Sequence, residues 1–326
     1  MQYFSIPACY FPSTALFIDD NRDFLLNFVL QLDEGLAYRI FDSPFDALDF
    51  IHKKNLEIST LGQRCHNYYN ENNQNNFAAI CNEMYNKRRF AEISVVVVDY
   101  AMPGMDGLEF CRRLSNSNIK KILLTGKAEE KLAVEAFNEG LIQRYIHKSD
   151  PEAAELITQS IYDLQWQYFQ NMSNSLVRRL SLHLSDNLLD RTFAGFFRDF
   201  CRQKMIIEHY VSDEDGNYFL LDNDAKASTL IVKHKTRLES DAELAASRGA
   251  SQDVINQIRN GEKILYRSRL DEQNLPLPLI TGHQVAPQSD YLYAHIQGIA
   301  PAFDKNRISS YYAYLDEIDA EELLLL

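Results

Sequence analysis

The first half of the sequence predicts an α/β fold, a doubly wound parallel sheet of five strands. Short apolar runs alternate along it with segments of helical spacing. Its most apolar run is the four consecutive valines at 95–98, and such a run without alternation is typical of a strand covered on both faces. This run ends in Asp99 and is followed by a loop of turn residues, as at the mouth of a parallel sheet.

The strands and helices follow one another in strict alternation. The five strand candidates are residues 14–20, 37–41, 93–99, 120–126 and 144–148. Helical spacing connects them over residues 24–32, 43–54, 107–114 and 128–140, and a further helix follows the last strand. Ser43 caps the second helix, a glycine closes the fourth, and Asp150-Pro151 predicts the start of the fifth.

Polar side chains stand where these strands end. They are Asp19, Asp20, Asp99, Thr125 and Lys148, and the carboxyl ends of parallel strands share one edge of a sheet. Three carboxylates in one pocket repel each other, and a hard divalent cation relieves that repulsion. Mg²⁺ prefers oxygen ligands and keeps room for a phosphoryl oxygen, which a lysine and a hydroxyl would complement.

The order of these residues, with the D-x-x-M-P-x-M-D-G pattern from Asp99, resembles the receiver domain of bacterial response regulators. The resemblance covers residues 14 to about 165 and implies a flavodoxin-like receiver. It implies that Asp99 accepts a phosphoryl group from a histidine kinase or phosphotransfer protein, with Mg²⁺ as cofactor. By the same resemblance, the Mg²⁺ ligands are Asp19, Asp20, Asp99 and the Ala101 carbonyl, and the phosphoryl-binding and switch residues are Thr125, Lys148 and Tyr145.

Two positions depart from the family pattern. The family usually has a proline directly after the lysine, but here Lys148 is followed by Ser149 and Asp150 before Pro151. Gly126 follows Thr125 where alanine is commoner. Neither change removes a chemical group from the site, although the first puts the shape of that loop in question.

We expect three parts: a receiver at 1–165, a linking helix at 166–186 and an output domain at 187–326. The receiver carries an insertion at about 55–92, which is either a surface loop or a surface for a partner or a dimer. Its basic cluster at 87–89 is too small to indicate nucleic-acid binding. The long helix either packs between the domains or carries the signal as a dimer seam.

The last part predicts an α+β domain with an antiparallel sheet. A helix at 188–204 precedes strands at 206–211, 217–222 and 228–233, and two short helices follow within 239–261. Further strands or a closing helix are expected at 263–268, 291–299 and 310–318. The acidic turn at 213–216 lacks the ligand spacing of a calcium loop. The many aromatic residues indicate a core, with a small-molecule pocket as the alternative.

The composition and the motif content argue against several classes of function. A net charge of −13 argues against a broad nucleic-acid surface, and five scattered cysteines fit reduced thiols in the cytoplasm. The start of the sequence is a poor signal peptide, and no apolar run has the length of a membrane span, so we expect a cytoplasmic protein without membrane contact. No phosphate loop, zinc motif, nucleophile elbow or cyclic-dinucleotide enzyme motif occurs, so no catalytic residue is predicted.

The expected function is therefore a phosphorylation-switched regulator whose output domain acts by binding or self-association, with a homodimer as the expected assembly. The layout as a whole resembles an uncommon subfamily of quorum-sensing response regulators, of the kind found in Legionella. Two alternatives stay open. Turnover of a substrate by the C-terminal half would favour a receiver-controlled enzyme, and salt-sensitive DNA binding by residues 170–326 would favour a transcriptional regulator.

Overall fold

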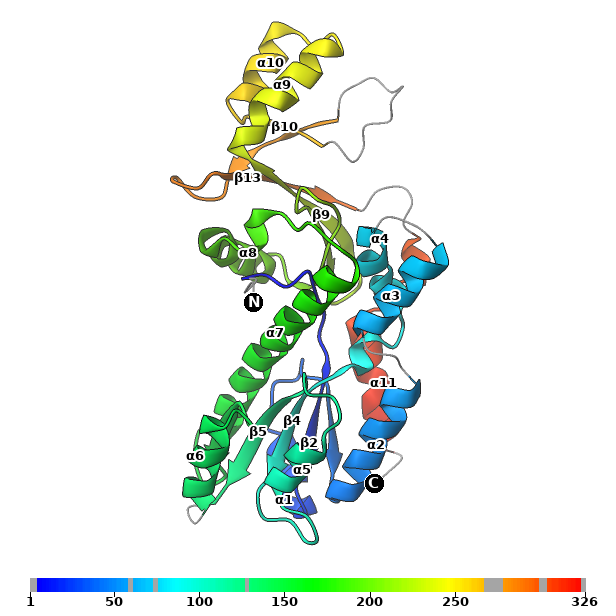
Figure 1. Ribbon diagram of the computed structural model, residues 1–326, viewed down its shortest axis with the longest axis vertical. Helices are drawn as coiled ribbons and strands as arrows, with labels where there is room; N and C mark the ends of the chain where they lie inside the picture. The colour runs from blue at the N-terminus through cyan, green and yellow to red at the C-terminus, as the bar shows by residue number, and fades with distance from the viewer. Residues whose placement is uncertain are drawn as a thin grey trace. The chain divides into compact units, whose positions relative to one another are not determined.

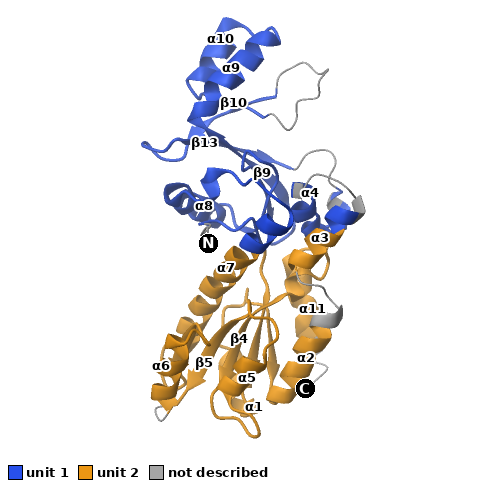
Figure 2. Ribbon diagram, viewed as in Figure 1, with its two compact units in different colours: residues 1–10, 68–85, 173–308 blue, residues 11–67, 86–172, 309–326 orange. Residues whose placement is uncertain are grey.

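A computed structural model describes residues 5–57, 61–72, 76–126, 129–266, 278–298 and 304–323. The chain divides into two compact units, which Figure 2 shows in separate colours. The parallel-sheet unit consists of residues 11–67, 86–172 and 309–326, and the antiparallel-sheet unit of residues 1–10, 68–85 and 173–308. In the described part of the chain, no helix has both the length and the apolar character needed to cross a bilayer.

The parallel-sheet unit contains the five-stranded parallel sheet that the sequence predicts. Its strands are β2 (Thr14–Ile18), β3 (Tyr38–Phe41), β4 (Ile93–Asp99), β5 (Lys120–Thr125) and β6 (Arg144–His147) (Figure 1). Their order is β3-β2-β4-β5-β6, and all four pairings are parallel. This is the flavodoxin-like order, in which the chain reverses its direction of winding between β2 and β4. The predicted fold class is confirmed.

Helices cover both faces of this sheet. They are α1 (Arg22–Val29), α2 (Pro44–Glu57), α5 (Gly107–Arg113), α6 (Glu130–Asn138) and α7 (Ala153–Arg179). Residues of α2, α5 and α6 share one core with Val96 and Val98, and residues of α1 and α7 share the other with Val95 and Val97. Because successive side chains of a strand point to opposite faces, all four valines are fully buried. Each contributes roughly 1.5–3 kcal/mol relative to an exposed side chain.

The antiparallel-sheet unit is built on a six-stranded sheet in the order β1-β7-β8-β9-β13-β12. The strands are β1 (Cys9–Tyr10), β7 (Ile206–Val211), β8 (Tyr218–Asp222), β9 (Ala227–His234), β13 (Tyr291–Gln297) and β12 (His283–Gln284). A second sheet pairs β10 (Lys263–Leu265) with β11 (Leu279–Thr281). In the part of the unit after residue 180, the helices are α8 (Arg191–Gln203), α9 (Leu238–Ser247) and α10 (Gln252–Arg259), with 3-10 turns at Asp186–Leu188, Lys235–Arg237 and Lys305–Arg307. The predicted antiparallel output sheet is thereby confirmed, although the parts of its predicted segments that fall in 267–277 and at 299 lie outside the described residues.

Aromatic rings fill the core between α8 and this sheet. Phe197 packs on Tyr218 with ring centroids 4.7 Å apart, and Phe193 lies 5.5 Å from Tyr291. These rings occupy core positions, as expected for most of the aromatic residues. In the acidic turn between β7 and β8, Asp213 accepts hydrogen bonds from the backbone and side-chain N–H groups of Asn217, so its carboxylate closes the turn.

The compact units divide the chain differently from the expected boundaries at three places. The N-terminal strand β1 belongs to the antiparallel sheet, where Cys9 and Tyr10 pair with β7. Part of the insertion belongs there too. The insertion forms α3 (Leu61–Asn72), α4 (Asn76–Cys81) and 3-10 turns at Asn82–Tyr85 and Arg89–Ala91, and the Cys81 Sγ donates a hydrogen bond to the Val211 carbonyl. The helix α11 (Tyr311–Leu323) instead belongs to the parallel-sheet unit.

Long-range hydrogen bonds explain the position of α11. The Tyr311 hydroxyl donates to the Gly35 carbonyl at 2.9 Å and accepts from the Ala37 N–H at 3.0 Å. Arg89 is fully buried, and its Nη2 donates to the Ser309 carbonyl at 2.7 Å. The last arginine of the basic cluster at 87–89 therefore has a structural role, while the two residues before it are exposed.

Candidate functional site

The three acidic side chains meet at the carboxyl edge of the parallel sheet. Asp99 is the last residue of β4, and Asp19 and Asp20 follow β2, its parallel neighbour. Oxygen atoms of the three carboxylates lie within 4.8 Å of one another. Asp19 and Asp99 are buried, and Asp20 is exposed. Adjacent parallel strands that end in acids thus produce a cluster with one side open to solvent.

Lys148 joins two of these carboxylates. It follows β6, and its Nζ lies 2.5 Å from the Asp19 Oδ2 and 2.9 Å from the Asp99 Oδ1. The backbone N–H of Lys148 donates to the Thr125 carbonyl, which extends the pairing of β6 with β5 to the mouth of the site. The ammonium group also lies 4.9 Å from the centre of the Phe24 ring. The single positive charge is therefore shared between two buried negative charges, which would otherwise be uncompensated.

The electrostatics of the cluster shift two pKa values upward. Burial raises the pKa of Asp99, and the Asp19 charge adds to this effect, while the hydrogen bond and the charge of Lys148 oppose it. Burial by itself lowers the pKa of Lys148, but the hydrogen bonds and charges of Asp19 and Asp99 outweigh burial and raise it. Lys148 is consequently held in its charged form across the neutral range.

The loop after β4 is folded tightly against the site by its turn residues. A Cβ atom at Gly107 would lie 2.3 Å from the Asp99 carbonyl oxygen, so only glycine allows this approach. The Gly107 N–H donates to the Tyr100 carbonyl at 2.9 Å. Gly104 has a φ of +77°, a conformation that favours glycine. Asp106 caps α5 by accepting a backbone hydrogen bond at 2.7 Å. The M-P-G-M-D-G sequence thus fixes the backbone around Asp99.

Thr125 and Tyr145 lie on the neighbouring strands. Thr125 is the buried last residue of β5, and its Oγ1 lies 3.3 Å from the Nδ1 of His147. Tyr145 is half-buried on β6, and its ring stands edge-on to those of His147, at 6.5 Å, and Phe137, at 6.4 Å. His147 was not among the residues expected from the sequence. The register of β5 and β6 identifies it, because His147 is the direct cross-strand partner of Thr125.

The predicted site residues are therefore placed in two groups. Asp19, Asp20, Asp99 and Lys148 form one cluster, and Thr125 and Tyr145 belong to the strands beside it. Ala101 follows in the exposed loop after β4.

The loop that lacks the family's proline is a hydrogen-bonded turn. The Asp150 N–H donates to the His147 carbonyl at 3.1 Å, and the Asp150 Oδ1 accepts from the Glu152 N–H at 2.9 Å. The helix α7 begins at Ala153, two residues after the expected start at Pro151.

The donor set of the cluster fits a hard divalent cation. It consists of carboxylate oxygens alone, one of them on an exposed side chain, and hard cations such as Mg²⁺ prefer oxygen ligands and retain several waters. Because Asp20 is exposed, water can reach this side of the cluster.

The chain is similar to known response regulators in sequence and in structure. Residues 67–160 match the response regulator receiver domain family. The solved structure of the Legionella pneumophila response regulator LqsR is 53% identical, covers 98% of this chain and 99% of that chain, and superposes with a TM-score of 0.85. A structure of an adenylate cyclase from Rhodopirellula baltica is 22% identical over 52% of this chain and 98% of that chain, with a TM-score of 0.37. A receiver domain of an HD domain-containing protein from Pseudomonas fluorescens Pf-5 is 20% identical over 49% of this chain and 93% of that chain, with a TM-score of 0.34. The comparison with curated proteins gives no match. The chain belongs to the response regulator family, and its five-stranded parallel sheet is that of a receiver domain.

Proposed function

We propose that Asp99 is the phospho-acceptor of this response regulator and that a histidine kinase or a phosphotransfer protein supplies the phosphoryl group. One observation carries the proposal: the buried Asp99 carboxylate at the carboxyl edge of the sheet is paired with an ammonium group that also contacts a second buried carboxylate. A carboxylate kept in place by a charged hydrogen bond is preorganised to act as a nucleophile.

The chemistry is a phosphoryl transfer between a nitrogen and an oxygen. An oxygen of Asp99 attacks the phosphorus of a phosphohistidine, a P–O bond forms and the P–N bond breaks. The imidazole leaves with the electron pair and takes up a proton. Lys148, whose raised pKa keeps it charged, remains within reach of the acyl phosphate and pairs with one of its oxygens.

Asp19, Asp20, Asp99 and the Ala101 carbonyl would hold Mg²⁺. When bound, the ion would neutralise negative charge on the transferring group. The chain's own contribution is the fixed position of these oxygens, which follows from the strand ends and the tight loop at Gly107.

We further propose that Thr125 binds the phosphoryl group and that Tyr145 responds as a switch residue. The helix α7 has residues 153–172 in the receiver and 173–179 in the antiparallel-sheet unit, so it is a continuous element through which a shift can reach the output domain. The output domain then acts by binding or by self-association into a homodimer. The layout supports a role in quorum sensing.

The test is phosphorylation by a small donor. We expect intact-mass measurement after incubation with acetyl phosphate and Mg²⁺ to show one added phosphoryl group on the wild type and none on Asp99→Asn. Asp106→Asn is the matched control, because it changes an acid of the same loop and keeps a helix-capping side chain. Equal labelling of Asp99→Asn and wild type would refute Asp99 as the acceptor.

The output is tested separately by size-resolved light scattering with and without Mg²⁺ and beryllofluoride, which mimics the acyl phosphate. We expect the mass of the wild type to increase towards a dimer and the mass of Asp99→Asn to stay constant. An unchanged mass for both would exclude dimerisation as the switch, and the phosphorylation result would stand by itself.

A further inference from the structure

His147 occupies a position between the phosphorylation site and the aromatic residue Tyr145. It is the direct cross-strand partner of Thr125. Its Nδ1 also forms a hydrogen bond with the Thr125 Oγ1, at 3.3 Å. Its ring also stands edge-on to that of Tyr145, two residues earlier on β6. Residues at this spacing on a strand share one face of the sheet, so the three side chains form a continuous row.

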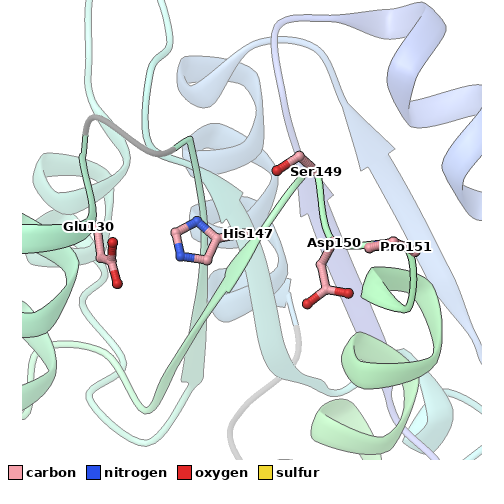
Figure 3. A pocket seen from close by; sticks show the side chains of 5 residues that line it. All are labelled: Glu130, His147, Ser149, Asp150 and Pro151. Atoms are coloured by element: carbon pink, nitrogen blue, oxygen red, sulfur yellow. The ribbon is translucent and has the colours of Figure 1, made fainter.

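A pocket of about 390 Å³ lies beside the His147 ring. It is lined by Glu130, His147, Ser149, Asp150 and Pro151. Figure 3 shows Glu130 and the His147 ring on one side of this pocket, with a ring nitrogen on the Glu130 side. When the Thr125 hydroxyl is the donor of its hydrogen bond to His147, the ring Nδ1 is the acceptor.

We propose that His147 is a positioning residue that holds the Thr125 hydroxyl in the resting receiver and releases it on phosphorylation. This inference rests on the proposed phosphorylation of Asp99. A hydroxyl carries one hydrogen, so a Thr125 that donates to His147 cannot donate to a phosphoryl oxygen. Phosphoryl binding by Thr125 therefore breaks the bond to His147.

Release of Thr125 also changes a series of side-chain contacts that extends to the surface of the receiver. Once Thr125 withdraws, the His147 ring has lost a partner on one side and has the pocket on the other. A shift of this ring changes its edge-on contact with Tyr145, which in turn contacts Phe137 on α6. Phe137 is 48% exposed, so the row that starts at Thr125 ends on the outside of the molecule.

The experiment measures the affinity of the full chain for beryllofluoride in saturating Mg²⁺ by calorimetry. We expect His147→Leu, which removes the hydrogen-bonding nitrogen, to bind about two- to tenfold more tightly than the wild type, because the resting hydrogen bond no longer opposes binding. His147→Asn can place a polar atom near the position of Nδ1 and should restore wild-type affinity. Should His147→Leu fail to fold, His147→Ala takes its place.

Thr125→Val separates the proposed role from a merely structural one. In this background the hydroxyl is absent, so His147→Leu should have no effect on the affinity. An effect of the same size in both backgrounds would overturn the inference, and so would wild-type affinity of His147→Leu in the native background. A wild type that does not bind beryllofluoride at all would refute the phosphorylation site itself together with the role of His147.

Discussion

Replacing Lys148 by methionine tests the charge balance of the site. The substitution keeps much of the side-chain length and removes the ammonium that joins Asp19 and Asp99. At the 2.9 Å separation from Asp99, the attraction in an effective dielectric of 20 is about 6 kcal/mol, most of which desolvation offsets. Removing one partner of a buried ion pair costs about 3–5 kcal/mol. Because the Lys148 side chain is 26% exposed, we expect a loss of about 2 kcal/mol in the free energy of unfolding.

The same substitution should increase the amount by which Mg²⁺ raises the free energy of unfolding of the receiver. Two unpaired carboxylates bind a divalent cation more tightly than two that share an ammonium group. A ligand that binds the native state alone, at a hundred times its dissociation constant, stabilises by about 2.7 kcal/mol. We therefore expect Mg²⁺ to restore most of the stability that Lys148→Met loses and to stabilise the wild type by less.

The assay is urea unfolding followed by tryptophan fluorescence, with EDTA or with Mg²⁺. The sequence has one tryptophan, Trp166, and it lies on α7 within the receiver, so the signal reports this domain. Lys131→Met, at an exposed position of α6, is the matched control. Our reasoning about the charge balance is wrong if Lys148→Met in EDTA is as stable as the control, or if Mg²⁺ stabilises it no more than the wild type.

Three further predictions follow. The pKa of Asp99 is higher in the folded state than in the unfolded state. The protonated Asp99 therefore contributes to the free energy of unfolding at a pH below its unfolded pKa, and this contribution is lost as the pH rises through its folded pKa. Asp99→Asn should thus be at least as stable as wild type at neutral pH, with a gap in the urea midpoints that closes below about pH 4. Burial lowers the pKa of His209 to about 4, so its contribution is present above about pH 6.5 and is lost, by about 3 kcal/mol, as the pH falls to 4. Near-UV circular dichroism should show that His209→Phe removes this acid sensitivity and that His183→Phe, at an exposed position, does not. Arg89→Met should cost about 2 kcal/mol and speed hydrogen exchange in α11, whereas the exposed neighbour Arg88→Met should leave the exchange unchanged.

The parallel sheet could be predicted because its signals are local. The valine run at 95–98 is covered on both faces because the sheet lies between helices, and four of the strands, β2, β4, β5 and β6, end in or next to a polar residue that the sheet brings to one edge. The positions of Asp19, Asp99 and Lys148 follow from strand ends alone, without knowledge of any side-chain contact.

Long-range contacts explain what the sequence could not show. The strand β1 has two residues, too few for a periodic pattern, and it exists through its pairing with β7. The segment at 310–318 allowed a strand or a helix, and the partners of Tyr311 near residue 36 decide where α11 packs. Likewise, arginine is usually a surface residue, but Arg89 is buried. It donates a hydrogen bond to the Ser309 carbonyl, 220 positions further along the chain.

The most direct test of the central claim is a crystal structure of the full chain with Mg²⁺ and beryllofluoride. We predict that the beryllium is bonded to a carboxylate oxygen of Asp99, that Mg²⁺ contacts Asp19 or Asp20, and that Lys148 contacts a fluoride. Electron density for beryllofluoride at another residue, with Asp99 still paired to Lys148 as it is here, would contradict the assignment of this cluster as the phosphorylation site.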